Sequence, residues 1–299
     1  MGTLLAHIRL TRPANIITAM ADILAGAAVS GAVFLLLEEG SRLFWGDLGW
    51  LLLATIGLYG GGVAFNDVFD AGLDKLERPE RPIPSGQATV KSAAWMAFLL
   101  LLGGIVAAFQ VDFTAGLLAV LVALFAVLYD AWGKHQRIFG PINMGLCRAG
   151  NLFLGMTLIS DAIREYWYIG WVPLVYVAAI TMVSRGEVHG KNKSALYGGL
   201  FLYVAVVVFI GTLAFLRENY WWETLPFLLL LTYFIFPPLV KALKSQEPAL
   251  IGKSVKAAVL ALILVNASLA AAFSGWWVAL IILLLLPVSL LLARVFAVT

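Results

Sequence analysis

Residues 50–74 read WLLLATIGLYGGGVAFNDVFDAGLD, and this segment changes from apolar to acidic within a few positions. Its first part carries no charged side chain, whereas its end carries Asn66, Asp67, Asp70 and Asp74. An apolar helix of about 20 residues crosses the hydrocarbon core of a bilayer, which is about 30 Å thick. The segment therefore predicts a membrane-spanning helix that ends on a cluster of acids at the membrane surface.

The whole chain has the composition of a membrane protein. Of its 299 residues 62% are hydrophobic and only 12% are charged, whereas about 45–50% are apolar in a soluble domain. Apolar stretches of about 18–24 residues, each long enough to span a bilayer, recur along the chain. They predict an all-α integral membrane protein, a bundle of nine or ten transmembrane helices around a central cavity with a cytoplasmic cap, with spans at residues 14–37, 48–66, 91–111, 114–132, 141–160, 165–184, 195–216, 222–243, 253–273 and 276–297.

The basic residues predict the orientation of these spans. Most of the 20 Lys and Arg residues fall on one side of the membrane, and the other side carries only Arg42, Arg164 and Arg217. Because basic loops remain in the cytoplasm, the acidic cluster is expected on the cytoplasmic face. We expect a protein of a prokaryotic plasma (inner) membrane, surrounded by membrane lipid and without a nucleic-acid partner.

The acidic cluster indicates a metal site. Asp67, Asp70 and Asp74 follow the spacing i, i+3, i+7, which places them on one face of a helix. They lie at the C-terminal end of the apolar helix, where the helix dipole disfavours negative charge. A solvated helix end is the alternative. Mg²⁺, which prefers hard oxygen ligands and often keeps a phosphate in its shell, suits such a cluster within a membrane protein.

A proline-rich loop with two arginines follows the acids. Arg78 and Arg81 belong to the sequence RPERPIPSG, residues 78–86, in which the prolines exclude a continuous helix. The positive-inside rule alone accounts for basic residues here. The planar fork of arginine also suits phosphate oxygens, so we expect both arginines, and Lys134 from another loop, to bind an anionic substrate.

A second polar loop follows the span 165–184 and faces the same side. In it Glu187 suits a metal, Lys191 suits a diphosphate, and His189 suits acid–base chemistry because its ordinary pKa is about 6.5. A solvated histidine is the alternative for His189. Tyr129, at the same end of another span, offers an aromatic face to a carbocation.

Two charges lie inside predicted spans. Asp22 is in the first span, and Arg148 lies in the fifth together with Asn151. Charges at this depth cost several kcal/mol and usually face an interior cavity. Either the two form a structural ion pair, or at least one contacts the substrate. The single cysteine, Cys147, makes an intrachain disulfide impossible.

The motif residues together resemble a known family. Asn66-Asp67-Val68-Phe69-Asp70, Asp74 and the loop 78–86 resemble the first aspartate-rich motif of the UbiA superfamily of intramembrane prenyltransferases. Supporting matches are the segments 12–15 (RPAN) and 148–151 (RAGN) and the loop of Tyr129. The resemblance covers residues 8–273 of a single domain, 1–299, and leaves 276–297 as an additional helix.

The resemblance implies Mg²⁺-dependent transfer of a prenyl group from an isoprenyl diphosphate to a small acceptor. It implies Mg²⁺ ligands at Asn66, Asp67, Asp70 and Glu187, with Asp74 and Lys191 also catalytic. The substrate-binding residues that it implies are Asn15, Asp22, Arg78, Arg81, Tyr129, Lys134, Arg148, Asn151, Arg185 and His189.

The second motif departs from the family pattern. Where the family has two acids four residues apart, this chain has Glu187 and Lys191, so Lys191 takes over part of the charge of a second metal. The loop 184–190 resembles the EboC-type branch of the superfamily. That resemblance implies a polar acceptor, such as a cyclitol or sugar derivative, in place of a quinone-type ring.

Two other functions are compatible with these residues. One is a lipid-diphosphate binder or transporter that does not turn over. The other is transfer of a phosphorylated sugar or cyclitol onto a polyprenyl phosphate, which the polar second loop suits.

Overall fold

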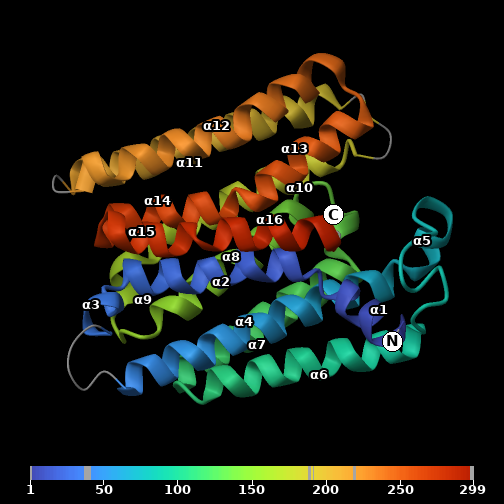
Figure 1. Cartoon of the computed structure of the whole chain (residues 1–299), viewed down its shortest axis with the longest axis horizontal. Coiled ribbons are helices and arrows are strands. Elements are labelled where there is room, and N and C mark those ends of the chain that lie inside the picture. Colours follow the sequence, from blue (N-terminus) through green and yellow to red (C-terminus); the bar gives the residue numbers. More distant parts are fainter. Residues whose placement is uncertain (1, 37–41, 188–189, 191, 218–219, 297–299) are drawn as a thin grey trace.

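The computed structural model describes residues 2–36, 42–187, 190, 192–217 and 220–296. These residues form helices and contain no strand (Figure 1), so the predicted all-helical membrane architecture is confirmed. The helices are α1 (Gly2–Leu10), α2 (Pro13–Val29), α3 (Ala32–Leu35), α4 (Arg42–Phe69), α5 (Ala71–Glu77), α6 (Val90–Phe109), α7 (Phe113–Ala131), η1 (Gly133–His135), α8 (Phe139–Met156), α9 (Ala162–Tyr166), η2 (Trp167–Gly170), α10 (Trp171–Ser184), α11 (Lys193–Leu216), α12 (Trp221–Ser245), α13 (Pro248–Leu260), α14 (Leu262–Ser274), α15 (Trp276–Leu283) and α16 (Leu285–Val295).

Eight helical segments of the described chain are long and apolar enough to cross a membrane. The predicted number of nine or ten is not confirmed by this criterion. The first predicted span corresponds to α2, which is apolar but has only 17 residues. The fifth corresponds to α8, which carries Asn143, Arg148 and Asn151 and is not among the eight.

Glycines bring the helices around the cavity close together. A Cβ on Gly57 of α4 would lie 2.5 Å from the carbonyl oxygen of Leu100 on α6, and Gly26 of α2 faces Gly155 of α8 in the same way. Small residues four apart, as in Gly57 and Gly61, allow backbone contact between membrane helices, where van der Waals packing replaces the hydrophobic effect. These contacts fix the end of α4 on which the acids lie.

The C-terminal helices complete the bundle around α14. Every residue of α14 is buried, and α2, α11, α12 and α15 pack around it. Gly275 turns the chain in a left-handed conformation (φ 92°), after which α15 and α16 run back beside α2 (Figure 1). The predicted last span, 276–297, therefore corresponds to these two consecutive helices.

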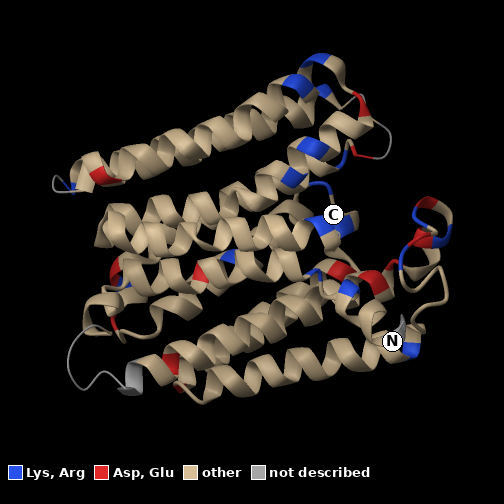
Figure 2. Ribbon diagram, in the orientation of Figure 1, with Lys and Arg blue, Asp and Glu red and all other residues tan. Residues whose placement is uncertain are grey.

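Charged side chains gather at one end of the bundle. Figure 2 shows most Lys, Arg, Asp and Glu residues around α1, α5, the end of α12 and the start of α13, while the helices between the two ends are almost uncharged. The proline-rich loop is ordered at this end, because Ile83 is buried and Ala88 donates a backbone hydrogen bond to Pro82. It forms part of the predicted cap.

Candidate active site

A cavity of about 390 Å³ opens between the helices at the charged end. Residues from α2, α4, α5, α7, α8, α10, α13 and α14 line it, and the three polar loops predicted to share one cavity all contribute. Its mouth is charged and its walls below are mainly apolar. The predicted site residues that line it are Asn15, Asn66, Asp70, Asp74, Arg78, Arg81, Tyr129, Lys134, Arg148, Asn151 and Glu187.

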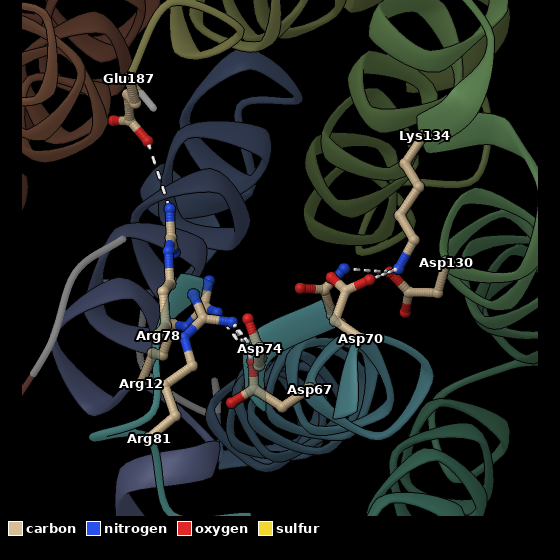
Figure 3. A network of polar contacts seen from close by, with 10 residues as sticks. Arg12, Asp67, Asp70, Asp74, Arg78, Arg81, Asp130, Lys134 and Glu187 are labelled. Atoms are coloured by element: carbon tan, nitrogen blue, oxygen red, sulfur yellow. Dashed lines mark hydrogen bonds and ion pairs between the residues drawn. The ribbon is translucent and has the colours of Figure 1, made fainter. Parts of the chain in front are cut away.

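The acidic cluster lies across a break between two helices. Asp67 belongs to α4, Asp70 occupies the junction, and Asp74 belongs to α5. The backbone N–H of Asp74 still donates to the carbonyl oxygen of Asp70 at 2.8 Å, so the helical rise continues across the junction. The three carboxylates do not share one face, contrary to the expectation from their spacing. Asp67 and Asp74 turn toward one side of the mouth and Asp70 turns toward the other (Figure 3).

Three arginines gather at the Asp67 side of the mouth. The Nη1 of Arg81 donates to Asp67 Oδ1 at 3.1 Å and to Asp74 Oδ2 at 2.8 Å. The Nη2 of Arg12 donates to the same Asp67 oxygen at 3.0 Å. Arg78 lies beside them (Figure 3). Arg12 itself has a left-handed backbone (φ 48°) just before Pro13, an uncommon conformation for a non-glycine residue.

The opposite side of the mouth joins α4 to α7. Lys134 Nζ lies 2.5 Å from Asp70 Oδ1, and the side chain of Lys134 is largely buried. Next to this ion pair, Asn66 Nδ2 donates a hydrogen bond of 2.8 Å to Asp130 Oδ1. Figure 3 shows Asp130 beside Asp70 and Lys134. This side therefore carries two carboxylates, one amide and one ammonium group.

Glu187 stands apart from the other acids, close to Arg78. Its Oε2 lies 3.9 Å from Arg78 Nη2, while its Oε1 is buried and has no hydrogen-bond partner among the residues that the structure describes. Burial raises the pKa of Glu187, and the charges of Arg78, Arg12 and Arg81 oppose that rise. A buried carboxylate oxygen without a partner is costly unless a ligand satisfies it. The other two residues predicted in this loop, His189 and Lys191, lie outside the described residues.

The oxygen donors at the mouth fit a magnesium ion. Among the residues that the structure describes, no three His, Cys, Asp or Glu side chains already form a cluster that could hold a metal. Asn66 and Asp70 nevertheless bring an amide and a carboxylate to the cavity wall, and Glu187 brings an oxygen with no protein partner. Mg²⁺ binds such hard oxygen donors, commonly one or two carboxylates together with phosphate oxygens and water.

A polar cluster forms the floor of the cavity. Asp22 is almost fully buried and accepts hydrogen bonds from Arg148 Nη1 (2.8 Å), Asn151 Nδ2 (3.0 Å) and Asn266 Nδ2 (2.7 Å). Arg148 Nη2 also donates to Thr18 Oγ1 at 2.7 Å. The Asp22–Arg148 ion pair, one of the two alternatives left open by the sequence, is present and ties α2, α8 and α14 together. Its charges cancel, which permits burial at this depth.

Three predicted site residues do not line the cavity. Asp22 lies behind Arg148, and Asp67 lies behind the arginines that bind it. Arg185 is exposed and donates from Nη2 to the backbone oxygen of Gln136 at 2.9 Å, which joins the loop after α10 to the segment after η1.

Sequence analysis missed several residues of the site. Arg12 was noted only as part of the segment 12–15, and its position before Pro13 at a helix start was the available signal. Asp130, next to Tyr129, was another acid in an acid-poor chain. Tyr59, whose ring lies 5.2 Å from the guanidinium carbon of Arg148, and Asn266, which comes from the last third of the chain, carried no local signal.

The fold and the site together define a class of protein: an integral membrane enzyme whose central cavity has a charged mouth and apolar walls. Comparison with known families gives the family itself. The profile of the UbiA prenyltransferase family matches residues 26–254, and the chain belongs to this family.

The curated relatives include archaeal digeranylgeranylglyceryl phosphate synthases. That of Methanothrix thermoacetophila is 28% identical over 222 residues, which cover 67% of this chain and 78% of the relative. That of Methanosarcina mazei is 35% identical over 108 residues, 36% of this chain. The chain spans only 37% of the Methanosarcina mazei synthase and 59% of the Ignicoccus hospitalis synthase. The EboC-type assignment is not tested by these matches and stays a prediction.

Solved structures share the fold across almost the whole chain. A structure described as giving insights into digeranylgeranylglyceryl phosphate synthase in membranes has a TM-score of 0.65 at 20% identity and covers 91% of this chain and 99% of its own. A UbiA homolog from Archaeoglobus fulgidus, bound to DMAPP and Mg²⁺, has a TM-score of 0.63 at 13% identity, with the same coverage of 91% and 99%.

Proposed function

We propose that this prenyltransferase uses Mg²⁺ to transfer a prenyl group from an isoprenyl diphosphate to a small acceptor within the membrane. The observation that carries the proposal is the cavity itself. Acids and bases alternate around its mouth, its walls are apolar, and a neutral polar cluster forms its floor. The mouth suits a diphosphate, the walls suit a prenyl chain, and the floor suits an acceptor. The Archaeoglobus fulgidus homolog bound to DMAPP and Mg²⁺ supports the choice of donor and metal.

The cations at the mouth bind the leaving group. The reaction breaks the bond between the allylic carbon and the diphosphate oxygen, and the electron pair stays on the diphosphate. Arg78, Arg81 and Lys134 offer N–H donors to the charge that develops there, a form of electrostatic stabilisation that is strong in a cavity with low dielectric constant. Bound Mg²⁺ supplies further positive charge to the same oxygens.

Asn66, Asp67, Asp70 and Glu187 hold the metal in this proposal. Asp67 is engaged by Arg12 and Arg81, so a metal ion at Asp67 competes with both arginines. Diphosphate oxygens are the replacement acceptors for those guanidinium groups. Carboxylates then pair with the metal and arginines with the phosphate, so the number of charge-assisted contacts is maintained.

The apolar walls hold the prenyl chain. Val122 and Ala126 of α7, Val177 and Ile180 of α10 and Val259 of α13 line the cavity below its mouth. At the top of this wall, Tyr129 faces the cavity. Its ring stabilises the positive charge that develops on the allylic carbon as the diphosphate leaves.

The floor orients the acceptor. Arg148, Asn151 and Asn15 line this part of the cavity, and Asp22 holds Arg148 and Asn151 from behind. Because Asp22 cancels the charge of Arg148, the floor favours a neutral polar group over a second anion. A small acceptor with a hydroxyl group fits, as in the polar cyclitol or sugar derivative inferred from the loop 184–190. The acceptor attacks the allylic carbon and loses a proton.

The enzyme lies in the plasma membrane with the charged mouth toward the cytoplasm in this proposal. The basic residues at that end support the orientation by the positive-inside rule. Soluble isoprenyl diphosphates then reach the mouth from the cytoplasm, while their chains enter the apolar part of the cavity.

Release of diphosphate in detergent tests the proposal. We expect Mg²⁺-dependent release from geranyl, farnesyl and longer prenyl diphosphates in the presence of candidate acceptors. Asp70→Ala should lower the rate by about 100-fold or more, since several kcal/mol of charge stabilisation are lost. Asp67→Ala should lower the rate to a similar extent. Asp161 is an exposed acid between α8 and α9, and Asp161→Ala is the matched control. Tight binding of the diphosphates without any release would instead support a binder without turnover.

A further inference from the structure

Asp130 belongs to the site but to neither aspartate-rich motif, and no role is assigned to it by the family resemblance. It lies in the last turn of α7, its residue is only 4% exposed, and it lines the cavity. Its Oδ1 accepts the hydrogen bond of 2.8 Å from Asn66 Nδ2 on α4. This contact spans 64 residues of sequence and joins two helices at the cavity mouth.

The contact decides which end of the Asn66 amide faces the cavity. An ionised carboxylate is only an acceptor, so it binds the NH₂ group of an amide and repels its carbonyl oxygen. With Nδ2 turned toward Asp130, Oδ1 is the end of Asn66 that remains for a ligand. That oxygen is the only atom of the side chain able to bind a cation.

The contacts around Asp130 allow it to fix the orientation of the Asn66 amide. The Lys134–Asp70 ion pair lies close to Asp130 (Figure 3), and Asn66 Nδ2 donates a hydrogen bond to Asp130 itself. Residues that hydrogen-bond to a metal ligand from behind fix its orientation and raise its affinity for the metal. An asparagine that is free to rotate presents its NH₂ group to the cavity as readily as its carbonyl oxygen.

We propose that Asp130 is a positioning residue that holds the amide of Asn66 with its carbonyl oxygen toward the magnesium ion. The proposal rests on the proposed function, because it assigns Asn66 as a metal ligand. Asp130 thereby links α7 to the metal site of α4. An acid outside both aspartate-rich motifs then supports metal binding in a chain whose second motif has lost one acid.

Variants at position 130 distinguish a residue that orients Asn66 from one that binds Mg²⁺ directly. Asp130→Ala removes the acceptor, and the Mg²⁺ concentration for half-saturation should rise by about 10–100-fold, the usual effect of losing such a contact. Asp130→Asn keeps an acceptor oxygen for Asn66 Nδ2 but can also turn its own NH₂ group toward Asn66, so its value should lie between those of the wild type and Asp130→Ala. If Asp130→Asn is as weak as Asp130→Ala, the carboxylate acts through its charge or as a ligand, and the proposal is overturned. An Asp130→Ala protein with wild-type affinity overturns it as well.

Exchanging the residue types at positions 66 and 130 provides a second test, which does not depend on whether Asp130→Ala folds. Asn66→Asp places two carboxylates face to face and should weaken Mg²⁺ binding. The double variant Asn66→Asp/Asp130→Asn restores a donor and an acceptor with their positions exchanged, and should recover most of the affinity. Failure of the double variant to improve on Asn66→Asp contradicts the proposal.

The readout is binding, measured without turnover. Mg²⁺ is titrated by calorimetry into detergent-solubilised protein that holds geranyl S-thiolodiphosphate, a non-reacting analogue. Cys147, the single cysteine, lines the cavity and is partly exposed, so protection of its thiol from a maleimide gives a second measure of occupancy. Asp161→Asn is the matched control. Absence of Mg²⁺-dependent binding in the wild type contradicts the proposed function, whereas normal wild-type binding with unaffected position-130 variants contradicts only the role of Asp130.

Discussion

At the scale of single residues, the site is organised by which charge each side chain pairs with. Asp67 and Asp74 share Arg81, Asp70 pairs with Lys134, and Glu187 keeps one oxygen without a partner. The acids look equivalent in the sequence, but they differ in the basic side chains that a ligand must displace from them. Within the described part of the chain, Glu187 has no hydrogen bond to give up to a ligand, whereas a ligand of Asp67 would displace Arg12 and Arg81.

The ion pair at the cavity floor gives a prediction about stability. Asp22→Asn leaves the charge of Arg148 buried without a counterion, and we expect a loss of about 3–5 kcal/mol in the free energy of unfolding. Thr18→Val removes only a neutral acceptor of Arg148 and should cost about 1–3 kcal/mol. Unfolding in mixed micelles with increasing dodecyl sulfate measures both.

The double variant at the same floor tests the cause of that loss. Asp22→Asn/Arg148→Gln removes both charges, so its cost should be smaller than that of Asp22→Asn alone. If Asp22→Asn costs no more than Thr18→Val, the ion pair does not stabilise the floor in the way that its geometry indicates.

At the scale of helices, the sequence predicted positions better than boundaries. Each of the ten predicted spans overlaps a helix, because apolar length is a local property. The span 253–273 is in fact two helices, α13 and α14, which meet at Ala261. The end of α4 extends beyond the predicted residue 66 to Phe69, so Asp67 belongs to the helix and Asp70 to its junction with α5.

The pairing of helices was not predictable in the same way. The predicted metal ligands come from two short motifs, and Asn66, Asp70 and Glu187 do line one cavity, whereas Asp67 does not. Asp130 and Asn266 enter the site because α7 and α14 pack beside α4 and α2. Such contacts depend on packing between segments far apart in the sequence, for which no local pattern exists.

Two adjacent glycines of α6 test the packing that holds α4 in place. A Cβ on Gly104 would lie 2.8 Å from the backbone oxygen of Ala54 on α4, whereas a Cβ on Gly103 meets no atom within 4 Å. Gly104→Val should therefore destabilise the protein by about 1–3 kcal/mol through overpacking. Gly103→Val introduces the same side chain on the lipid-facing side and is the matched control.

Both glycine variants are measured by the same micellar unfolding experiment, with Mg²⁺-dependent diphosphate binding as a second readout. Because α4 carries Asn66 and Asp67 at its end, Gly104→Val should also weaken binding while Gly103→Val leaves it unchanged. Equal stability of the two variants would contradict the close contact between α4 and α6.

At the scale of the whole molecule, charge and cavity coincide. The cavity has its polar mouth at the end where charged residues gather (Figure 2), and the Asp22–Arg148 ion pair is at its floor. The same basic residues thus serve two purposes. In the proposed function they orient the protein in the membrane, and they form the positive side of a site for an anionic donor.

This coincidence predicts from which side the cavity is reached. Cys147 lines the cavity and is the only cysteine, so a membrane-impermeant methanethiosulfonate should label it in inverted membrane vesicles and not in right-side-out ones. Cys147→Ser abolishes the signal. In that background Asp161→Cys, exposed at the opposite end, should label only in right-side-out vesicles. Labelling of Cys147 from the outer side would mean that the mouth does not face the cytoplasm. The orientation inferred from the basic residues would then be wrong.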